Sequence, residues 1–290
     1  LDSGGAARAD VFSRILLAQY GQLPWRGCPM VPPEITLLPR WFPFHLSKVS
    51  YWSRTVMVPL AILYALDAKA RNPRQVGVRE LFTSPPDKER DYFPVWSWTN
   101  RIFLLFERTA ARLEPLIPGP IRRRAIRRAE EWVVERLNGE DGLGAIFPAM
   151  VNAYEALDRL GYGPDHPLRI QAGRALRNLV VEGESEAYCQ PCVSPVWDTA
   201  LAVHALLEKE DPEPHSGAVA GLDWLCQRQV TEPIGDWRET HPDLPPGGWA
   251  FQYNNDHYPD LDDTAAVGVA MQESGLTDRY GEAIQRALDW

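Results

Sequence analysis

The sequence of 290 residues lacks any run of about 20 apolar residues, the length that a membrane-spanning helix requires. It also lacks a secretory signal at its start. Positive charge is in deficit, because the formal net charge is −9, and this argues against nucleic acid as a general partner. These absences favour a folded chain that neither spans a bilayer nor binds nucleic acid.

Cysteine is scarce as well. The four cysteines include one Cys-x-x-Cys pair, Cys189 and Cys192, with no second pair and no histidines at ligand spacing. A redox pair would need a strand–helix context that this segment lacks. We therefore expect no metal site and interpret the cysteines as structural thiols in a reducing compartment.

Proline is abundant by contrast, with 26 residues scattered between apolar segments. Prolines placed in this way separate short helices. Apolar residues recur at helical spacing and alternating strand patterns are scarce, so the chain is expected to be all-α. The segments with the clearest helical spacing are 129–137, 150–160, 199–207 and 264–273.

A repeat organises these helices. Trp132, Asn178 and Trp224 stand 46 residues apart in three similar segments. A fourth copy begins at Ala287, with Trp290 in the equivalent place 66 residues after Trp224. A second phase matches as well, because Asp-Thr-Ala opens an apolar helix at Asp198 and again at Asp263. A period of this length with two helices per unit predicts a helical solenoid or a closed α/α barrel.

Two segments bear on membrane contact. The apolar stretch 56–66 is too short to cross a bilayer, so it is either core or a segment that dips into one leaflet. The basic cluster 122–128 is either the solvated face of a helix or a contact for anionic lipid headgroups.

Three carboxylates, Asp260, Asp262 and Asp263, crowd into four residues just before a helix. The simplest interpretation is an acidic N-cap with solvated neighbours. Calcium binding by an EF-hand loop is excluded, since Ala265 and Met271 stand where glycine and glutamate are needed. Magnesium–diphosphate binding would need carboxylates one turn apart on a helix face, and the following residues do not supply them.

Acid chemistry fits the cluster better. Crowded carboxylates cannot all ionise, so one of them retains a proton near neutral pH. Such an acid in an apolar pocket can protonate an alkene, and the resulting carbocation must be shielded from water and stabilised by aromatic faces. Candidate aromatic residues are Trp52, Trp197, Trp249, Phe251, Tyr253 and Tyr258.

The segments that carry these residues resemble squalene–hopene cyclases. The resemblance is strongest over 247–265, with its Asp-x-Asp-Asp signature, and extends to 194–206 and 42–60. The repeats around Trp132 and Trp224 resemble degenerate copies of that family's glutamine–tryptophan motif. Gln229, Gly235 and Trp237 keep the ending of the motif, whereas Leu137 and Leu143 replace its glutamine and tryptophan in the earlier copy.

The resemblance implies a role for each matching residue. Asp262 would be the proton donor, with Asp260 and Asp263 tuning and holding it. The other implied site residues are Trp197, Phe251 and Trp52 as π faces, Ile146 and Pro148 as cavity wall, and Val49 and Met57 as the apolar entrance. No cofactor or metal is implied, and none of the six histidines, His257 included, matches the family's assisting histidine.

The resemblance also implies an architecture and a setting. Residues 1–190 would form a largely complete first α/α-barrel domain, and 191–290 the beginning of a catalytic barrel. The enzyme would be monotopic on the cytoplasmic side of a membrane, possess an apolar membrane-facing side, and convert squalene to hopene or hopanol; an oligomer is compatible with this. The family's proteins are longer, so the chain is expected to be a central fragment that is inactive alone.

Two rival functions stay open. One is a related class II cyclase acting on a prenyl diphosphate, which would share the acid cluster and often require magnesium. The other is a non-catalytic helical-repeat protein that presents a groove to a partner. The helical-repeat hypothesis predicts polar residues pointing into the barrel, whereas the squalene–hopene cyclase hypothesis places Trp197 and Phe251 there.

Overall fold

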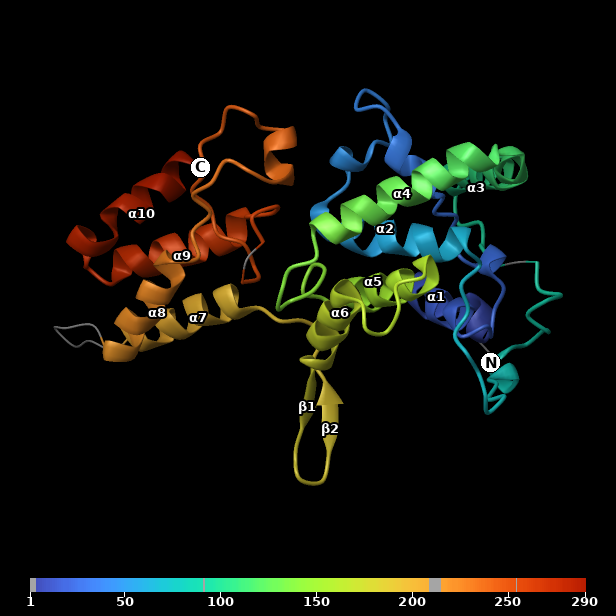
Figure 1. Ribbon diagram of the computed structural model, residues 1–290, viewed down its shortest axis with the longest axis horizontal. Coiled ribbons are helices and arrows are strands. Elements are labelled where there is room, and N and C mark those ends of the chain that lie inside the picture. The colour runs from blue at the N-terminus through green and yellow to red at the C-terminus, as the bar shows by residue number, and fades with distance from the viewer. Residues whose placement is uncertain (1–3, 91, 209–214, 254) are drawn as a thin grey trace. The chain divides into compact units, whose positions relative to one another are not determined.

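The computed structural model describes residues 4–90, 92–208, 215–253 and 255–290. The regular secondary structure in this part of the chain is almost entirely helical (Figure 1), which confirms the all-α expectation. The helices are α1 (Val11–Gln19), α2 (Tyr51–Ala65), α3 (Trp98–Leu113), α4 (Gly119–Glu135), α5 (Phe147–Leu160), α6 (Pro167–Arg177), α7 (Pro195–Leu207), α8 (Ser216–Cys226), α9 (Leu261–Glu273) and α10 (Thr277–Asp289). Short 3-10 helices are η1 (Ala6–Arg8), η2 (Trp25–Gly27), η3 (Pro33–Leu37), η4 (Leu46–Lys48), η5 (Arg79–Leu81), η6 (Glu114–Leu116) and η7 (Asp236–Glu239).

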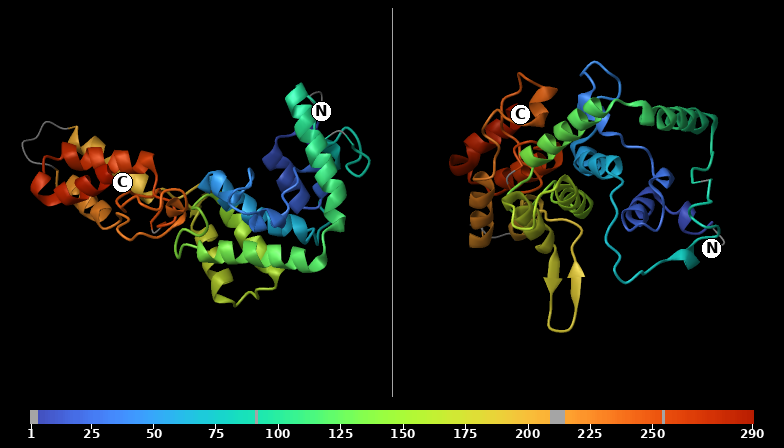
Figure 2. Two further views of the ribbon diagram at one scale, coloured as in Figure 1. Left: turned by 90° about the horizontal axis from the view of Figure 1, so that it is seen from above. Right: turned by 45° about the vertical axis from the view of Figure 1, so that its right-hand side comes forward.

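A short antiparallel hairpin is the exception to the helical pattern. It pairs β1 (Val180–Glu182) with β2 (Ala187–Cys189), Val180 lying opposite Cys189. Figure 2 shows it as a two-stranded ribbon that extends beyond α6. The hairpin was not expected from the sequence, because three residues per strand are too few to produce a visible alternation of apolar and polar residues.

The chain divides into two compact units. Unit 1 comprises Leu1–Leu38 and Leu60–Glu130, and unit 2 comprises Pro39–Pro59 and Glu131–Trp290. In unit 1 the middle of α2 is core, because Leu60, Ala61, Ile62 and Leu63 are all buried. The stretch 56–66 is therefore core, the first of its two interpretations. The domain boundary expected at residue 190 stays a prediction.

In unit 2, consecutive helices pack in pairs, α5 with α6, α7 with α8 and α9 with α10, and α9 also packs on α7. Small and apolar side chains fill the space among α7 to α10. The largest is Trp249, which is fully buried and donates its indole N–H to the carbonyl of Leu225 at 2.7 Å. The other core residues of this group are Val196, Ala200, Val203, Ala218, Leu222, Leu225, Val267, Ala270, Met271, Tyr280 and Ala283.

The sequence repeat marks equivalent places in these helix pairs. Trp132 and Trp224 lie near the carboxyl ends of α4 and α8, and Asn178 and Trp290 are the C-cap residues of α6 and α10. The repeat therefore marks the carboxyl end of α4 and of the second helix in each of the three pairs of unit 2. The two Asp-Thr-Ala sequences lie in the first turns of α7 and α9, the first helices of their pairs.

None of the described helices is both long and apolar enough to cross a bilayer. The basic cluster lies on α4, where Arg123, Arg124 and Arg127 are exposed and Arg122 pairs with Glu34 and Glu114. Exposed arginines are expected under both interpretations, the solvated helix face and the contact with lipid headgroups, and each stays a prediction.

Candidate active site

A cavity of about 570 Å³ in unit 2 brings the acidic cluster together with aromatic side chains from distant parts of the sequence. Its walls come from the start of α2, the beginnings of α5 and α7, and the segment that leads into α9. The lining residues are Trp52, Ile146, Trp197, Phe251, Tyr258, Asp260, Asp262 and Asp263. The three aspartates and three principal aromatic residues expected from the sequence therefore share one cavity.

The first turn of α9 fixes the three carboxylates. Asp260 is the N-cap residue, and its Oδ1 accepts a hydrogen bond from the backbone N–H of Asp263 at 2.9 Å. Asp262 and Asp263 follow inside the helix but face differently, because neighbouring helical residues are about 100° apart. Asp262 is exposed on the cavity, whereas Asp263 is only 2% exposed.

Burial and crowding determine where the cluster holds its proton. Burial raises the pKa of Asp263, and the nearby Asp260, Asp262 and Asp198 raise it further, to about 8. Burial is also the main cause that raises the pKa of Asp260, and its hydrogen bonds with Asp263 oppose the rise. At neutral pH, Asp263 therefore keeps a proton and shares it with Asp260, as expected when like charges compete in a confined site.

The aromatic side chains form a continuous wall in this cavity. The ring of Trp52 meets Phe251 edge-on at 5.5 Å and Tyr258 edge-on at 6.1 Å. Tyr258 in turn stacks on Tyr51 at 4.8 Å with 9° between the planes. Trp197 lines the cavity from the first turn of α7. Such a wall offers π electrons to a cation.

Comparison with known proteins identifies the family of this chain. The family model of the squalene–hopene cyclase N-terminal domain matches residues 1–185, and that of the C-terminal domain matches residues 193–290. The chain belongs to the squalene–hopene cyclase family.

Three bacterial proteins are among its relatives in this family. The chain is 46% identical to a squalene–hopene cyclase of Zymomonas mobilis over 100% of its own length and 45% of that protein. It is 48% identical to the squalene–hopene cyclase of Bradyrhizobium diazoefficiens, covering 99% of the chain and 44% of that protein. A probable squalene–hopene cyclase of Sinorhizobium fredii is also 48% identical, over 99% of the chain and 45% of that protein. The chain thus spans a little under half the length of these relatives.

The remaining positions matched to squalene–hopene cyclases are spread more widely. Ile146 lines the cavity, but Pro148, half-buried in the first turn of α5, is not among the lining residues. Val49 lines a second, smaller cavity of about 270 Å³. Met57 is half-buried in α2 and lines neither of these two cavities. The wall and entrance roles of these residues stay predictions.

Two of the candidate aromatic residues lie away from the cavity lining. Trp249 belongs to the core among α7 to α10. Tyr253 packs edge-on against Trp224 at 5.8 Å, and its backbone N–H donates to Asp141 at 2.8 Å. Both residues therefore contribute to the shape of the segment that carries Phe251, which lies between them in the sequence.

The burial of Asp263 was not anticipated, although the sequence holds a signal for it. Val267, Ala270 and Met271 follow at the spacing of one helical face, and all three are buried. A carboxylate at the head of such a stripe points toward the core, and Asp262, one position earlier, points elsewhere.

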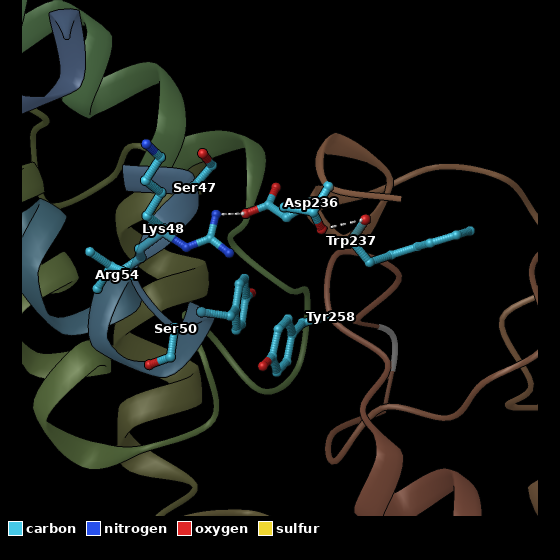
Figure 3. A pocket seen from close by; sticks show the side chains of 10 residues that line it. Ser47, Lys48, Ser50, Arg54, Asp236, Trp237 and Tyr258 are labelled. Atoms are coloured by element: carbon cyan, nitrogen blue, oxygen red, sulfur yellow. Dashed lines mark hydrogen bonds and ion pairs between the residues drawn. The ribbon is translucent and has the colours of Figure 1, made fainter. Parts of the chain in front are cut away.

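A buried ionic network next to the aromatic wall was missed altogether. Asp236 of η7 accepts a hydrogen bond from Arg54 Nη1 at 2.7 Å (Figure 3). It accepts further hydrogen bonds from Arg136. Burial alone would raise the pKa of Asp236, but the hydrogen bonds from His257 and Arg136 and both arginine charges lower it to about 2. Its sequence signal is a carboxylate between Gly235 and Trp237 of the repeat ending. His257 Nδ1 lies 3.5 Å from Asp236, so the ring contacts this network.

Within the described residues, no group of three or more histidine, cysteine, aspartate or glutamate side chains is arranged to hold a metal ion. The three aspartates of the cavity are instead arranged as a proton-holding cluster, with one carboxyl buried, one capping the helix and one exposed.

Proposed function

We propose that this protein cyclises squalene to hopene-type products by acid-initiated polycyclisation. The observation that carries the proposal is a single cavity in which a proton-holding carboxylate cluster faces a wall of aromatic rings. Membership of the squalene–hopene cyclase family and the names of the relatives support squalene as the substrate.

Asp262 is the proposed proton donor, because it is the exposed carboxyl of the cluster. The proton that Asp263 and Asp260 hold would pass to Asp262, whose O–H bond would then break while a C–H bond forms at the terminal alkene of squalene, leaving a tertiary carbocation in the chain. Asp263 and Asp260 hold a proton between them and keep the cluster from ionising completely. The amino end of α9 would stabilise the carboxylate that remains after transfer.

Ring closure would follow as successive alkenes attack the cation in a substrate folded by the cavity. Trp52, Phe251 and Trp197 would stabilise the moving charge through their π electrons. Positioning and electrostatic stabilisation would supply the rate enhancement. The sequence of closures ends when the last cation loses a proton, giving hopene, or captures water, giving hopanol.

The lining of the cavity supports an uncharged substrate. None of its described lining residues is lysine or arginine, and three are aspartates, so an anionic diphosphate would meet repulsion there. This favours squalene over a prenyl diphosphate. The half-buried aromatic lining also disfavours a polar groove for a protein partner.

The test is Asp262→Asn in the full-length protein, assayed with squalene. We expect cyclised product to fall by a factor of about 100 or more, because the amide cannot donate a comparably acidic proton. Asp223→Asn is the control, since Asp223 is a carboxylate of α8 that pairs with Arg279 and is not among the cavity-lining residues. Turnover near the wild-type value in Asp262→Asn would exclude it as the donor.

We also propose that the protein binds one face of a membrane without spanning it, on the cytoplasmic side where squalene would reach it. The support is α3 in unit 1, which leaves large apolar side chains exposed along much of its length. They are Trp98, Ile102, Phe103, Leu105, Phe106 and Leu113. An exposed apolar set of this size is typical of a membrane or protein contact.

A further inference from the structure

We propose that Arg54 and Asp236 are positioning residues that hold the Tyr258 part of the aromatic wall and thereby influence how completely the substrate is cyclised. The inference rests on the proposed function for its chemical consequence, but its structural part is independent of it. All the residues involved lie within unit 2.

The first connection runs through α2. Arg54 follows Tyr51 by three residues, so both side chains lie on the same helical face. The guanidinium carbon of Arg54 lies 5.7 Å from the centre of the Tyr51 ring, and that ring stacks on Tyr258. Arg54 is only 7% exposed, and its ion pair with Asp236 is therefore shielded from solvent. Fixing Arg54 thus fixes the surface on which Tyr258 rests.

The second connection runs through the backbone. The N–H of Asp236 donates to the carbonyl of His257, the residue before Tyr258, at 3.1 Å. Gly235 permits this approach, because its φ of 112° is left-handed and a side chain there would collide with the backbone of Asp256 and His257. Asp236 therefore holds Tyr258 from the chain side, while Arg54 holds it from the ring side.

Arg136 completes the anchor. It reaches Asp236 from just beyond the end of α4, and its guanidinium carbon lies 4.4 Å from the centre of the Trp132 ring. The ring centre of Trp132 in turn lies 6.5 Å from that of Tyr51. Three separate segments thus converge on one carboxylate next to the stacked tyrosines, a fixed arrangement that a catalytic cavity needs from its supporting residues.

The Tyr51–Tyr258 stack needs such an anchor because it is not packed solidly on both sides. Tyr258 lines the large cavity with the aspartates and also lines the second cavity of about 270 Å³, together with Tyr51, Arg54 and Asp236. Figure 3 shows the guanidinium of Arg54 directed at Asp236, with Tyr258 beside it. A ring bordered by open space on two sides keeps its position only through its stacking and hydrogen-bonded neighbours.

A displaced Tyr258 has a predictable chemical effect. The wall would no longer follow the folded polyene closely, and water or a neighbouring base could remove a proton from an early cation before the next ring closes. The C–H electrons would then form an alkene, and a mono- or bicyclic product would leave. The share of incompletely cyclised products therefore reports the position of the wall, whereas total turnover reports the acid.

The primary experiment is Arg54→Gln in the full-length protein, with products from squalene quantified by gas chromatography. Asp236 then keeps Arg136, so no buried carboxylate is left unpaired. We expect the share of incompletely cyclised products to rise about fivefold, a change of about 1 kcal/mol in the difference between two barriers. Tyr258→Leu should shift the products in the same direction, and the double variant should add little to either.

The matched control is Arg169→Gln. Arg169 also pairs with an aspartate, Asp158 at 2.7 Å, and lies 5.3 Å from a tyrosine ring centre, that of Tyr154, but it lies outside the lining of both cavities. Its product distribution should match the wild type. A role limited to stability would make both arginine variants melt earlier with unchanged product shares. That result, with Tyr258→Leu shifting the products, would overturn the inference.

A measurement without turnover separates this inference from the proposed function. With 3-fluorotyrosine incorporated, the ¹⁹F signal of Tyr258, assigned through Tyr258→Phe, should shift or broaden in Arg54→Gln and in Asp236→Asn but not in Arg169→Gln. A wild-type protein that leaves squalene unchanged would refute the proposed function alone. An unchanged Tyr258 signal in a folded Arg54→Gln protein would refute the positioning role.

Discussion

At the scale of single residues, the buried carboxyl of Asp263 combines a retained proton with a cost in stability. One of its oxygens, Oδ1, has no hydrogen-bond partner among the described residues, and a buried acceptor of this kind destabilises the fold. The same burial disfavours the ionised carboxylate, and the raised pKa of Asp263 expresses this. The cluster therefore holds a proton at the expense of the helix that carries it, as is common where a functional site is buried.

This leads to a prediction for Asp263→Asn. The pKa of Asp263 is about 8 in the folded protein and 3.8 without its surroundings, so the unfolded chain releases the proton first as the pH rises. The wild type should lose stability progressively between about pH 4 and pH 8, and the loss should be complete above that range. Asp263→Asn should remove this pH dependence. Its free energy of unfolding, taken relative to that of the wild type, should therefore be about 1–3 kcal/mol higher at pH 8 than at pH 4.

The measurement is urea denaturation of both proteins across that pH range. Asp223→Asn is a suitable control, because Asp223 is more exposed and pairs with Arg279, outside the cavity lining. An Asp263→Asn protein whose stability keeps the wild-type dependence on pH would contradict the assignment of the retained proton to Asp263. Cyclisation should fall in the same variant, since the cluster can no longer share a proton.

At the scale of elements, Gln229 joins the segment before the active site to the end of α10. Its amide Nε2 donates to the carbonyls of Gly247 at 2.7 Å and Ala283 at 2.8 Å, and its Oε1 accepts from Arg286 at 2.8 Å. Gln229 is only 7% exposed, so these bonds are shielded. This is a physical role for the glutamine of the repeat ending.

Gln229→Ala should therefore loosen α10 against the segment that begins at Gly247. Each net hydrogen bond contributes about 1 kcal/mol, so we expect a loss of about 2–3 kcal/mol in the free energy of unfolding. Hydrogen exchange of the α10 amides measures this locally. Gln285→Ala on the exposed side of the same helix is the control, with its one bond to Asp289. Equal protection in the two variants would contradict the role given to Gln229.

The elements also define what the sequence could and could not predict. The helices were predictable from apolar spacing, and Trp224 and Asn178 were informative because they recur at helix ends. Asp260 was predictable as a cap from its position before an apolar helix. The cavity partners Trp52 and Trp197 were expected through family resemblance, since 145 residues separate them and local spacing says nothing about such contacts.

The network around Asp236 could not be predicted either, because local spacing says nothing about contacts between distant segments. A lone aspartate in a turn is normally solvated, and only the folded chain brings Arg54 and Arg136 to it from segments 182 and 100 residues away. The exposed apolar surface of α3 was not predicted for a different reason. Its aromatic and aliphatic residues show the spacing of a core helix, and periodicity alone cannot tell a face that packs on protein from one that packs on lipid.

At the scale of the whole molecule, the proposed function would give α3 and the cavity different tasks toward one apolar substrate. Squalene dissolves in membranes and hardly at all in water, so an enzyme that consumes it needs access to the bilayer as well as a closed site. A helix that lies in the interface gives such access without spanning. Exposed arginines on α3, such as Arg101 and Arg108, would favour anionic headgroups next to the apolar residues.

The membrane proposal predicts that Phe103→Ser with Phe106→Ser weakens binding to vesicles that contain anionic lipid. Both rings are more than 60% exposed, at 66% and 69%, so the change removes apolar area without opening a core. Burying one such ring is worth about 1.5–3 kcal/mol, so replacing the pair should lower vesicle affinity by a factor of about 100 or more. Ile234→Ser with Leu288→Ser, exposed by 54% and 76% in unit 2, is the matched control and should cosediment like the wild type.

Squalene supplied in detergent micelles should still be cyclised by the α3 variant, because its cavity is intact, whereas squalene in vesicles should be consumed more slowly. Wild-type vesicle binding by the α3 variant would show that this helix is not the membrane contact and that its exposed face is covered by protein.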